Sequence, residues 1–509
     1  MYECILVNPM SIYYSKAERT NLTHYAGLMS IASVLDKNNC QTHVLDMVIE
    51  DSPEDALRRC IGEFREKVLI IGFSVMTSQL PHAVELSRFL KTDYPGIRII
   101  WGGVHPTLFP EEVLKMGLVD FVCIGEGEYT LLELISALKS ESDFRNINGL
   151  GFLRDGNIIC NESRKSHSLD DLPYFNYDLT DYAGFMHKIV SRGDSRSDRV
   201  RYGVVLTGVG CPYRCTFCIN SNKKLYFGKY RLKSAKRILD EIEFLIKRHQ
   251  INYFDFSDDN FFIKKDNVCE FISGIKERKL KFKWFTNIRA NYISAKYINM
   301  DMLNELENAG CYRLAIGAES GSQRILNELK KDITTEDIIR SARMLSNVNI
   351  GVTYSFMMGI PGETKKDIRL TLDLIQQLKK LKKDIAFIGP QIFRPYPGGE
   401  LYEECVCKYN YVVPKSVNEW INAVSLFTGY EDIENLNWIS DKKFVKKIFF
   451  YSAFTNLNIG ILKLGCVKKI TLHIAQISAN IRAKYRFWNL NVDMFLVLLY
   501  KKIKKGFSG

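Results

Sequence analysis

Three cysteines lie within eight residues of the chain, at Cys211, Cys215 and Cys218, in the run Gly-Cys-Pro-Tyr-Arg-Cys-Thr-Phe-Cys. Thiolates are the ligands that hold iron–sulfur clusters in proteins. Three thiolates leave one iron of a four-iron cluster without a protein ligand, whereas an electron-carrying cluster normally has four. The open iron could take a small molecule, so the triad predicts a catalytic cluster. The alternatives are buried thiols or a zinc site completed by distant residues, and the spacing is unusual for zinc.

The spacing Cys-x3-Cys-x2-Cys, with Phe217 directly before the last cysteine, resembles the signature of the radical S-adenosylmethionine (SAM) superfamily. The resemblance implies that Cys211, Cys215 and Cys218 bind a [4Fe-4S] cluster whose open iron chelates the methionine part of SAM. It also implies that one electron from the cluster cleaves SAM to a 5′-deoxyadenosyl radical, and that Phe217 lies near the adenine.

The cysteine loop follows an apolar run, Val204-Val205-Leu206, which we expect to be the first strand of a partial (β/α)6 barrel. Later apolar runs alternate with helical spacing, as such a barrel requires. The expected strands are 253–257, 284–287, 313–317, 351–357 and 385–393, and the expected helices are 235–247, 302–309, 335–345 and 366–381. Catalytic residues of such a barrel belong at the carboxyl ends of its strands.

Polar motifs follow three of these strands. Asp258 and Asp259 follow the second, Glu319 and Ser320 follow the fourth, and Gly359 opens Gly-Ile-Pro-Gly-Glu after the fifth. Each motif alone is compatible with a turn or a helix cap. In their order they resemble the superfamily segments that contact the amino group of SAM, its ribose and methionine, and its adenine. The resemblance therefore implies that these residues form the SAM site.

The first 140 residues also alternate short apolar runs with helical patterns, which predicts a doubly wound parallel sheet. The expected strands are 4–8, 42–46, 68–73, 97–102 and 121–125, and the expected helices are 28–35, 82–90 and 130–138. Ligands of such sheets bind beyond the carboxyl ends of the strands. Small and polar residues gather at those ends, where backbone can approach a bulky ligand closely. The candidate residues are Ser74, Gly102, Gly103, His105, Gly125 and Glu126.

These loops, including the phrase Gly-Gly-Val-His-Pro-Thr, resemble the cobalamin-binding domain that precedes the cluster motif in a large group of radical SAM enzymes. That group includes class B methyltransferases and the anaerobic magnesium-protoporphyrin ester cyclase. The segment Asp-x-His-x-x-Gly, which supplies a histidine to cobalt in other cobalamin proteins, is absent from the chain. The resemblance therefore implies cobalamin without a histidine ligand. We expect His105 to be a loop or cofactor-edge residue that forms hydrogen bonds, rather than a cobalt ligand.

The sequence thus predicts an α/β protein of four parts. They are a Rossmann-like cobalamin-binding domain at 1–145, a hairpin and linker at 146–195, the radical SAM partial barrel at 196–402, and a basic, mostly helical region at 403–509. The hairpin is expected at 149–160, with its turn at Asp155-Gly156.

The net charge of +12 arises in the last segment, because residues 441–509 hold 14 Lys and Arg against two Asp. Its apolar stretch Met494–Tyr500, followed by Lys-Lys-Ile-Lys-Lys, is compatible with an anionic membrane surface. We favour the alternative, a helix docked on the barrel with a solvated basic face. No nucleic-acid-binding module is recognised. Neither a signal peptide nor a membrane-spanning stretch is visible, which predicts a cytoplasmic protein, at most peripheral on the inner face of the membrane.

The pairing of the two domains favours methyl transfer to an unactivated carbon of a small-molecule or lipid-like substrate. The alternatives are radical oxidative cyclisation, ring rearrangement or hydroxylation on the same scaffold, and a cobalamin-binding sensor or carrier with a degenerate barrel. A methylthiotransferase is disfavoured because Cys4, Cys40 and Cys60 lie in strand or helix patterns and do not resemble ligands of a second cluster. The absence of a second cluster motif also implies an external low-potential electron donor, such as a flavodoxin or ferredoxin.

Overall fold

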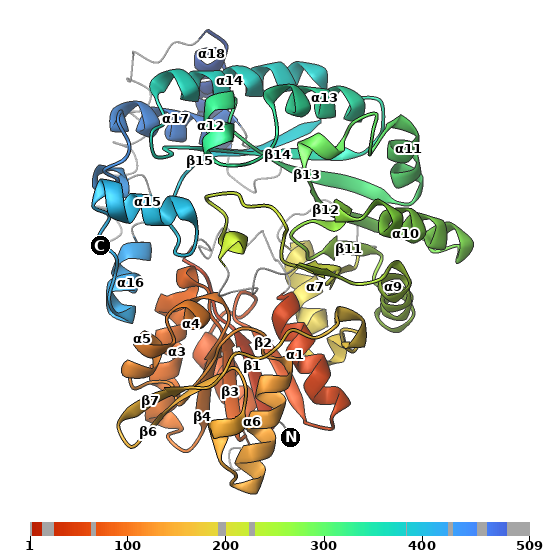
Figure 1. The fold of residues 1–509 in the computed structure, drawn as a ribbon. Coiled ribbons are helices and arrows are strands. Elements are labelled where there is room, and N and C mark those ends of the chain that lie inside the picture. Colours follow the sequence, from red (N-terminus) through yellow and green to blue (C-terminus); the bar gives the residue numbers. More distant parts are fainter. Residues whose placement is uncertain are drawn as a thin grey trace.

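The computed structural model describes residues 3–12, 25–62, 68–191, 200–222, 230–382, 384–425, 431–455 and 466–485. Two largely parallel sheets, each covered by helices, lie one above the other in Figure 1.

The N-terminal sheet has seven strands in the order β2-β1-β3-β4-β5-β6-β7. The parallel strands are β1 (Cys4–Asn8), β2 (Thr42–Asp46), β3 (Ile70–Ser74), β4 (Arg98–Gly102) and β5 (Phe121–Cys123), and the antiparallel hairpin is β6 (Leu150–Arg154) with β7 (Asn157–Cys160). The flanking helices are α1 (Ala26–Lys37), α2 (Pro53–Ile61), α3 (Leu80–Asp93), α4 (Val104–Leu108), α5 (Pro110–Lys115) and α6 (Glu128–Ser140). Both faces of the central strands are buried, so these strands are continuously apolar. The predicted doubly wound sheet is confirmed.

The second sheet has six parallel strands in the order β15-β14-β13-β12-β11-β8. Its strands are β8 (Tyr202–Val205), β11 (Tyr253–Phe256), β12 (Lys283–Ile288), β13 (Cys311–Glu319), β14 (Gly351–Met358) and β15 (Ile385–Ile392). The covering helices are α9 (Ala235–His249), α10 (Lys265–Glu277), α11 (Met300–Asn308), α12 (Gln323–Glu328), α13 (Thr335–Leu345) and α14 (Lys365–Leu381), arrayed along the outer face (Figure 1). Each strand neighbours the next in the sequence, so this is the predicted partial barrel.

A two-stranded antiparallel ribbon, which the sequence analysis did not predict, flanks the cysteine loop. It pairs β9 (Gly208–Val209) with β10 (Arg231–Leu232). The loop therefore leaves and re-enters the barrel through one hydrogen-bonded ribbon.

The linker between the two sheets packs on the first barrel helix. Phe175 is buried, and its backbone N–H donates to Glu241 of α9 at 3.1 Å. Glu241 also forms an ion pair with Lys233, which directly follows β10, at 2.6 Å, and both side chains are almost completely buried. The last described part of the linker forms the helix α7 (Tyr182–Ser191).

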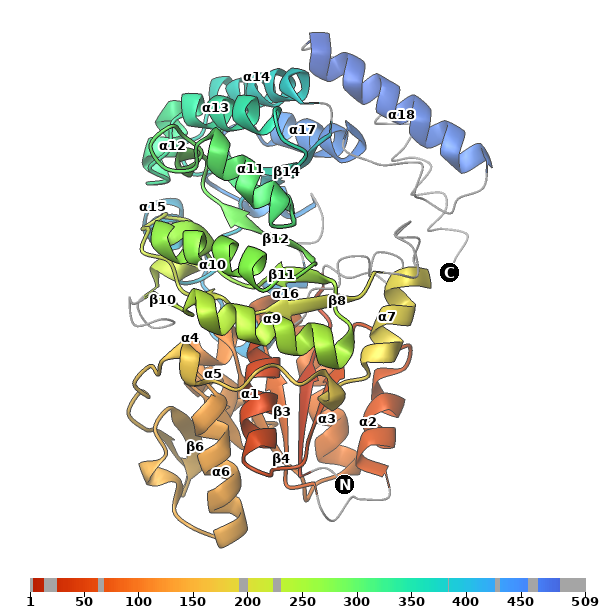
Figure 2. The same ribbon diagram turned by 90° about the vertical axis from the view of Figure 1, so that its right-hand side faces the viewer.

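The C-terminal region is helical, as predicted. It contains α15 (Glu400–Tyr409), α16 (Val417–Ser425), α17 (Lys442–Thr455) and α18 (Cys466–Tyr485). In Figure 1, α16 lies beside the helices α3 to α5 that flank the N-terminal sheet, and in Figure 2 α18 projects from the upper edge of the barrel near α17. The stretch Met494–Tyr500 lies outside the described residues. No helix in the described part of the chain is long and apolar enough to cross a membrane.

Candidate functional site

The cysteine loop is held in place by hydrogen bonds from its backbone. Gly210 has a positive φ of 79°, and its N–H donates to Asp259 Oδ2 at 2.9 Å. Thr216 is fixed on both sides, because its N–H donates to Leu329 O and its C=O accepts from the N–H of Leu401, each at 3.0 Å. The loop is therefore attached to the second strand end, to the segment after α12, and to α15.

The three predicted cluster ligands are free thiols, of which Cys215 is buried and Cys211 and Cys218 are half-buried. Burial raises the pKa of Cys211, and it raises that of Cys218 to about 11, while the neighbouring Cys215 and Asp259 add to both shifts. Iron would have to displace these protons, since metals bind the thiolate.

The donor set suits a cluster better than a single ion. Among the described residues, no three His, Cys, Asp or Glu side chains are arranged to hold one metal ion. A four-iron cluster attaches each thiolate to a different iron, so its ligands stand farther apart. Three thiols on one short loop can meet that requirement.

Asp258 and Asp259, predicted to meet SAM, both act on the cysteine loop in this structure. Asp258 accepts a hydrogen bond from Thr207 and another from Thr286 at 3.4 Å, and burial raises its pKa to about 7. Asp259 accepts from Gly210, as described above. A contact of either carboxyl with SAM stays a prediction.

Lys331 contacts both Glu319, the last residue of β13, and Phe217 of the cysteine loop. Lys331 Nζ donates to Glu319 Oε1 at 2.9 Å and lies 5.5 Å from the centroid of the Phe217 ring. Glu319 has a left-handed φ of +61°, which is uncommon for a residue with a side chain and marks functional sites more often than other places. The structure thus joins two of the predicted SAM-contacting residues and adds a lysine that the sequence analysis missed.

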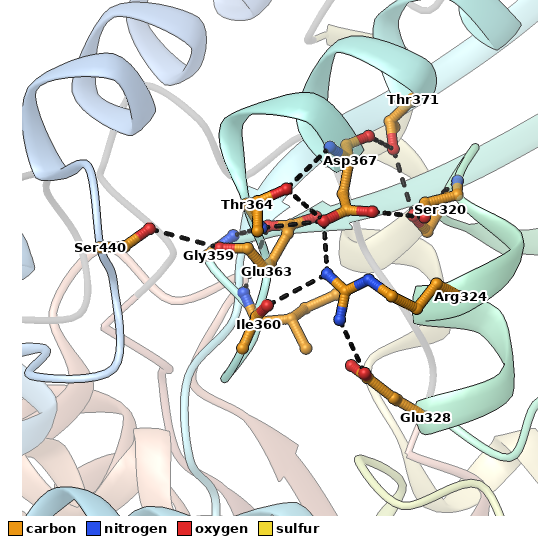
Figure 3. Close-up of polar contacts among 12 residues, drawn as sticks. Ser320, Arg324, Glu328, Gly359, Ile360, Glu363, Thr364, Asp367, Thr371 and Ser440 are labelled. Carbon is orange, nitrogen blue, oxygen red and sulfur yellow. Dashed lines mark hydrogen bonds and ion pairs between the residues drawn. The ribbon is translucent and has the colours of Figure 1, made fainter.

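Ser320 and Gly359 make polar contacts with neighbouring residues of the protein (Figure 3). Ser320 is fully buried, and its hydroxyl lies 3.2 Å from that of Thr371. Gly359 donates its N–H to Glu363 Oε2 at 2.6 Å, and its C=O accepts from Trp438 Nε1 at 2.8 Å. Their side-chain and backbone groups therefore shape the loops around the candidate SAM site, and direct contact with SAM stays a prediction.

A pocket opens at the carboxyl ends of β1, β3, β4 and β5, where the cobalamin-binding loops are predicted. The space between its lining atoms, with the open solvent at its mouth included, is about 410 Å³, and the lining comprises Ser74, Gly102, Gly103 and Gly125, together with apolar residues of the sheet and of α1. Gly103 has φ +95°, and a Cβ there would come within 3.0 Å of the Val75 backbone nitrogen. A side chain at Gly103 would therefore collide with the backbone after β3, and its positive φ also favours glycine.

His105 and Glu126, the other two predicted residues, contact other parts of the protein. His105 lies in the short helix α4, not in a loop, and is completely buried 5.1 Å from the ring of Phe109 and 5.8 Å from that of Trp420 in α16. Burial lowers its pKa to about 3, so the imidazole is neutral. Nε2 has no partner in the described chain.

Glu126 joins the loop after β5 to the ribbon of β9 and β10. Its carboxylate pairs with Arg231 of β10, and its other oxygen lies 3.3 Å from His167 Nδ1. Arg231 also donates to the C=O of His167. Because β10 pairs with the strand that leads into the cysteines, this clasp connects a loop of the cobalamin pocket directly to the cluster loop.

Two known protein families match separate parts of the chain. Residues 16–135 match the B12 binding domain and residues 205–375 match the Radical SAM superfamily. An uncharacterized methyltransferase of Pyrococcus horikoshii is 28% identical over 383 residues, which are 75% of this chain and 78% of that protein. The anaerobic magnesium-protoporphyrin IX monomethyl ester cyclase of Rubrivivax gelatinosus is 24% identical over 385 residues, 73% of this chain and 65% of that one.

The fold also matches a solved structure. The cobalamin-dependent S-adenosylmethionine radical enzyme OxsB, with aqua-cobalamin and S-adenosylmethionine bound, superposes with a TM-score of 0.69 at 18% identity, covering 99% of this chain and 75% of that one. Both domains are therefore present in the predicted order. The chain belongs to the radical SAM superfamily, among the cobalamin-dependent enzymes of that superfamily.

Proposed function

We propose that the protein methylates an unactivated carbon of a small-molecule or lipid-like substrate. The observation that carries the proposal is the clasp between Glu126, at the cobalamin pocket, and Arg231, on the ribbon of the cysteine loop. It holds the two cofactor loops against each other, so a substrate between them would meet both cofactors. When bound, the cluster with SAM supplies a radical that removes a hydrogen atom, and cobalamin supplies a methyl group.

The residues of the chain would hold and orient these groups. Cys211, Cys215 and Cys218 would bind the cluster, and the Lys331–Glu319 pair with Phe217 would receive SAM. The glycines of the pocket would let cobalamin approach the sheet. The closed contact between the domains would exclude water from the space where substrate reacts.

The second candidate is a radical cyclisation or rearrangement without methyl transfer, which the similarity to the ester cyclase favours. The first candidate has the support of the methyltransferase relative, of which the chain covers a larger share.

The two candidates differ in what becomes of the methyl group of SAM. Anaerobically reconstituted protein, loaded with hydroxocobalamin, is incubated with titanium citrate and SAM that carries a deuterated methyl group. Methyl transfer predicts S-adenosylhomocysteine and deuterated methylcobalamin, together with 5′-deoxyadenosine. Replacement of Cys211, Cys215 and Cys218 by Ala should abolish 5′-deoxyadenosine formation. Formation of 5′-deoxyadenosine with no labelled methylcobalamin would contradict methyl transfer and support the second candidate.

We also propose that the C-terminal region touches an anionic membrane surface through α18. Ile474, Ile477 and Ile481 are 63%, 56% and 50% exposed, whereas Ala479 on the opposite side is buried. A spacing of three and four residues places these isoleucines in one apolar stripe facing outward. Residues 442–492 contain ten Lys and Arg and no Asp or Glu, which complements anionic lipid.

Vesicles of phosphatidylcholine with and without phosphatidylglycerol test this contact. Replacing the three isoleucines by Ser in the full chain should reduce sedimentation with the anionic vesicles at least tenfold. The control is Leu153→Ser, since Leu153 is 55% exposed on the distant strand β6. Equal binding of the triple variant and the unmodified protein would refute the proposal.

A further inference from the structure

Arg289 is a buried cation beside the cysteine loop that none of the proposed roles uses. It follows β12 directly, and 8% of its surface is exposed. Its guanidinium lies 3.5 Å from the centroid of the Tyr213 ring, and Tyr213 stands between the first two cysteines of the triad. Arg289 is therefore fixed against the loop itself.

The nitrogens of Arg289 have unequal partners. One terminal nitrogen donates to the C=O of Lys331 and lies 3.5 Å from that of Asp332. The other terminal nitrogen points at the Sγ of Cys215, at 3.9 Å, and Nε has no partner. Within the described part of the chain, no carboxylate forms an ion pair with it. All other contacts of this charge are to neutral groups.

This arrangement is costly unless a negative charge lies nearby. A buried charge without a counter-charge loses its hydration, and two carbonyls with one aromatic face offset only part of that loss. A residue that only anchored the turn at Lys331 would need one donor group, which the first terminal nitrogen provides. The second terminal nitrogen faces sulfur, which becomes strongly negative only as a thiolate.

We propose that Arg289 is the counter-charge of the iron–sulfur cluster and, acting through Cys215, a positioning residue that raises the reduction potential of the cluster. This inference rests on the proposed cluster ligation. A cluster held by three thiolates carries net negative charge, and one-electron reduction by a low-potential donor adds another. A fixed cation that donates to a ligand sulfur stabilises the reduced state more than the oxidised one, as hydrogen bonds and charge do at iron–sulfur centres generally.

Redox titration of the reconstituted full-length protein, followed by electron paramagnetic resonance without SAM, measures this effect. Arg289→Gln should disfavour reduction about tenfold, a shift of about 59 mV to lower potential for a one-electron couple. Arg289→Lys should shift the potential less, because it retains the charge. The matched control is Arg340→Gln, since Arg340 also donates to a backbone carbonyl, that of Ile293, but is paired with Asp337 and lies away from the cysteines.

A second measurement does not depend on how well a variant assembles. In unmodified protein labelled with 15N-arginine, the reduced cluster should show a hyperfine coupling to 15N that disappears in Arg289→Lys. An unchanged potential in Arg289→Gln with an intact cluster, or no 15N coupling in the unmodified protein, would overturn the inference. Failure of the unmodified protein to form any reducible four-iron cluster would instead overturn the assignment of the cysteines.

Discussion

Replacing Lys233 by Met should destabilise the protein more than any exposed ion-pair substitution. Lys233 and Glu241 are 1% and 0% exposed, and their charged atoms lie 2.6 Å apart. Removal of the lysine leaves the Glu241 carboxylate buried, and among the described residues the N–H of Phe175 is then its one hydrogen-bond donor. Breaking one partner of a buried pair typically costs about 3–5 kcal/mol, since the remaining charge is uncompensated.

The pair also connects the linker to the ribbon of the cysteine loop. Lys233 donates its backbone N–H to Thr207 O at 2.9 Å, next to β9. We therefore expect increased hydrogen exchange at both the linker and the ribbon in Lys233→Met, in addition to a lower denaturation midpoint in urea.

Two further variants make the test decisive. In Lys233→Met/Glu241→Leu both charges are absent, so much of the lost stability should return. Lys236→Met, which removes the exposed Lys236–Asp240 pair of the same helix, should change stability little. A loss below about 1 kcal/mol in Lys233→Met, or no recovery in the double variant, would refute the reasoning.

Three other outcomes follow from the structure. Burial raises the pKa of Glu363 from 4.5 to about 8, so the folded protein keeps a proton that the unfolded chain loses. Between these pH values, this group lowers the free energy of unfolding by at most about 1.4 kcal/mol per pH unit as pH rises. In Glu363→Gln, the thermal midpoint should therefore depend less on pH. If the variant and the unmodified protein gave parallel plots of thermal midpoint against pH, the raised pKa of Glu363 would be contradicted. Gly359→Ala should lower the free energy of unfolding by about 1–2 kcal/mol or more, because Gly359 has φ +69° and a Cβ there would lie 2.9 Å from a side-chain carbon. The control Gly156→Ala should lower it less, since Gly156 has φ +77° but open space around the new Cβ. Equal denaturation midpoints of the two variants would argue against steric crowding at Gly359. Arg231→Gln should lower the yield of methylcobalamin relative to 5′-deoxyadenosine, because the ion pair between Arg231 and Glu126 is lost. An unchanged ratio of the two products would show that this ion pair has no part in the mechanism.

Much of the fold could be predicted because it is encoded in short-range patterns. Strands such as Cys4–Asn8 and Thr42–Asp46 have the expected bounds, since apolar runs broken by helical spacing suffice to mark a parallel sheet. The ribbon of β9 and β10 escaped prediction because two-residue strands separated by a long loop leave no periodic signal.

Some residues of the candidate site could likewise be predicted from the sequence, and others could not. The cysteine triad, its place after the first barrel strand and the glycines of the cobalamin pocket follow from residue type and local spacing. Arg289 and Lys331 carry no local signal beyond their positions after a strand and a helix, so the sequence analysis missed them.

The sequence by itself determined the two domains and their order, and it predicted three cysteines as cluster ligands, because thiol spacing and strand periodicity are local properties of the chain. Only the tertiary structure decided which polar side chains remain available to cofactors. Glu126 pairs with Arg231, more than a hundred residues later, and His105 is covered by Trp420 from the C-terminal region. Such partners meet only after the domains pack, and burial and pairing, rather than residue type, then determine which groups can face a ligand.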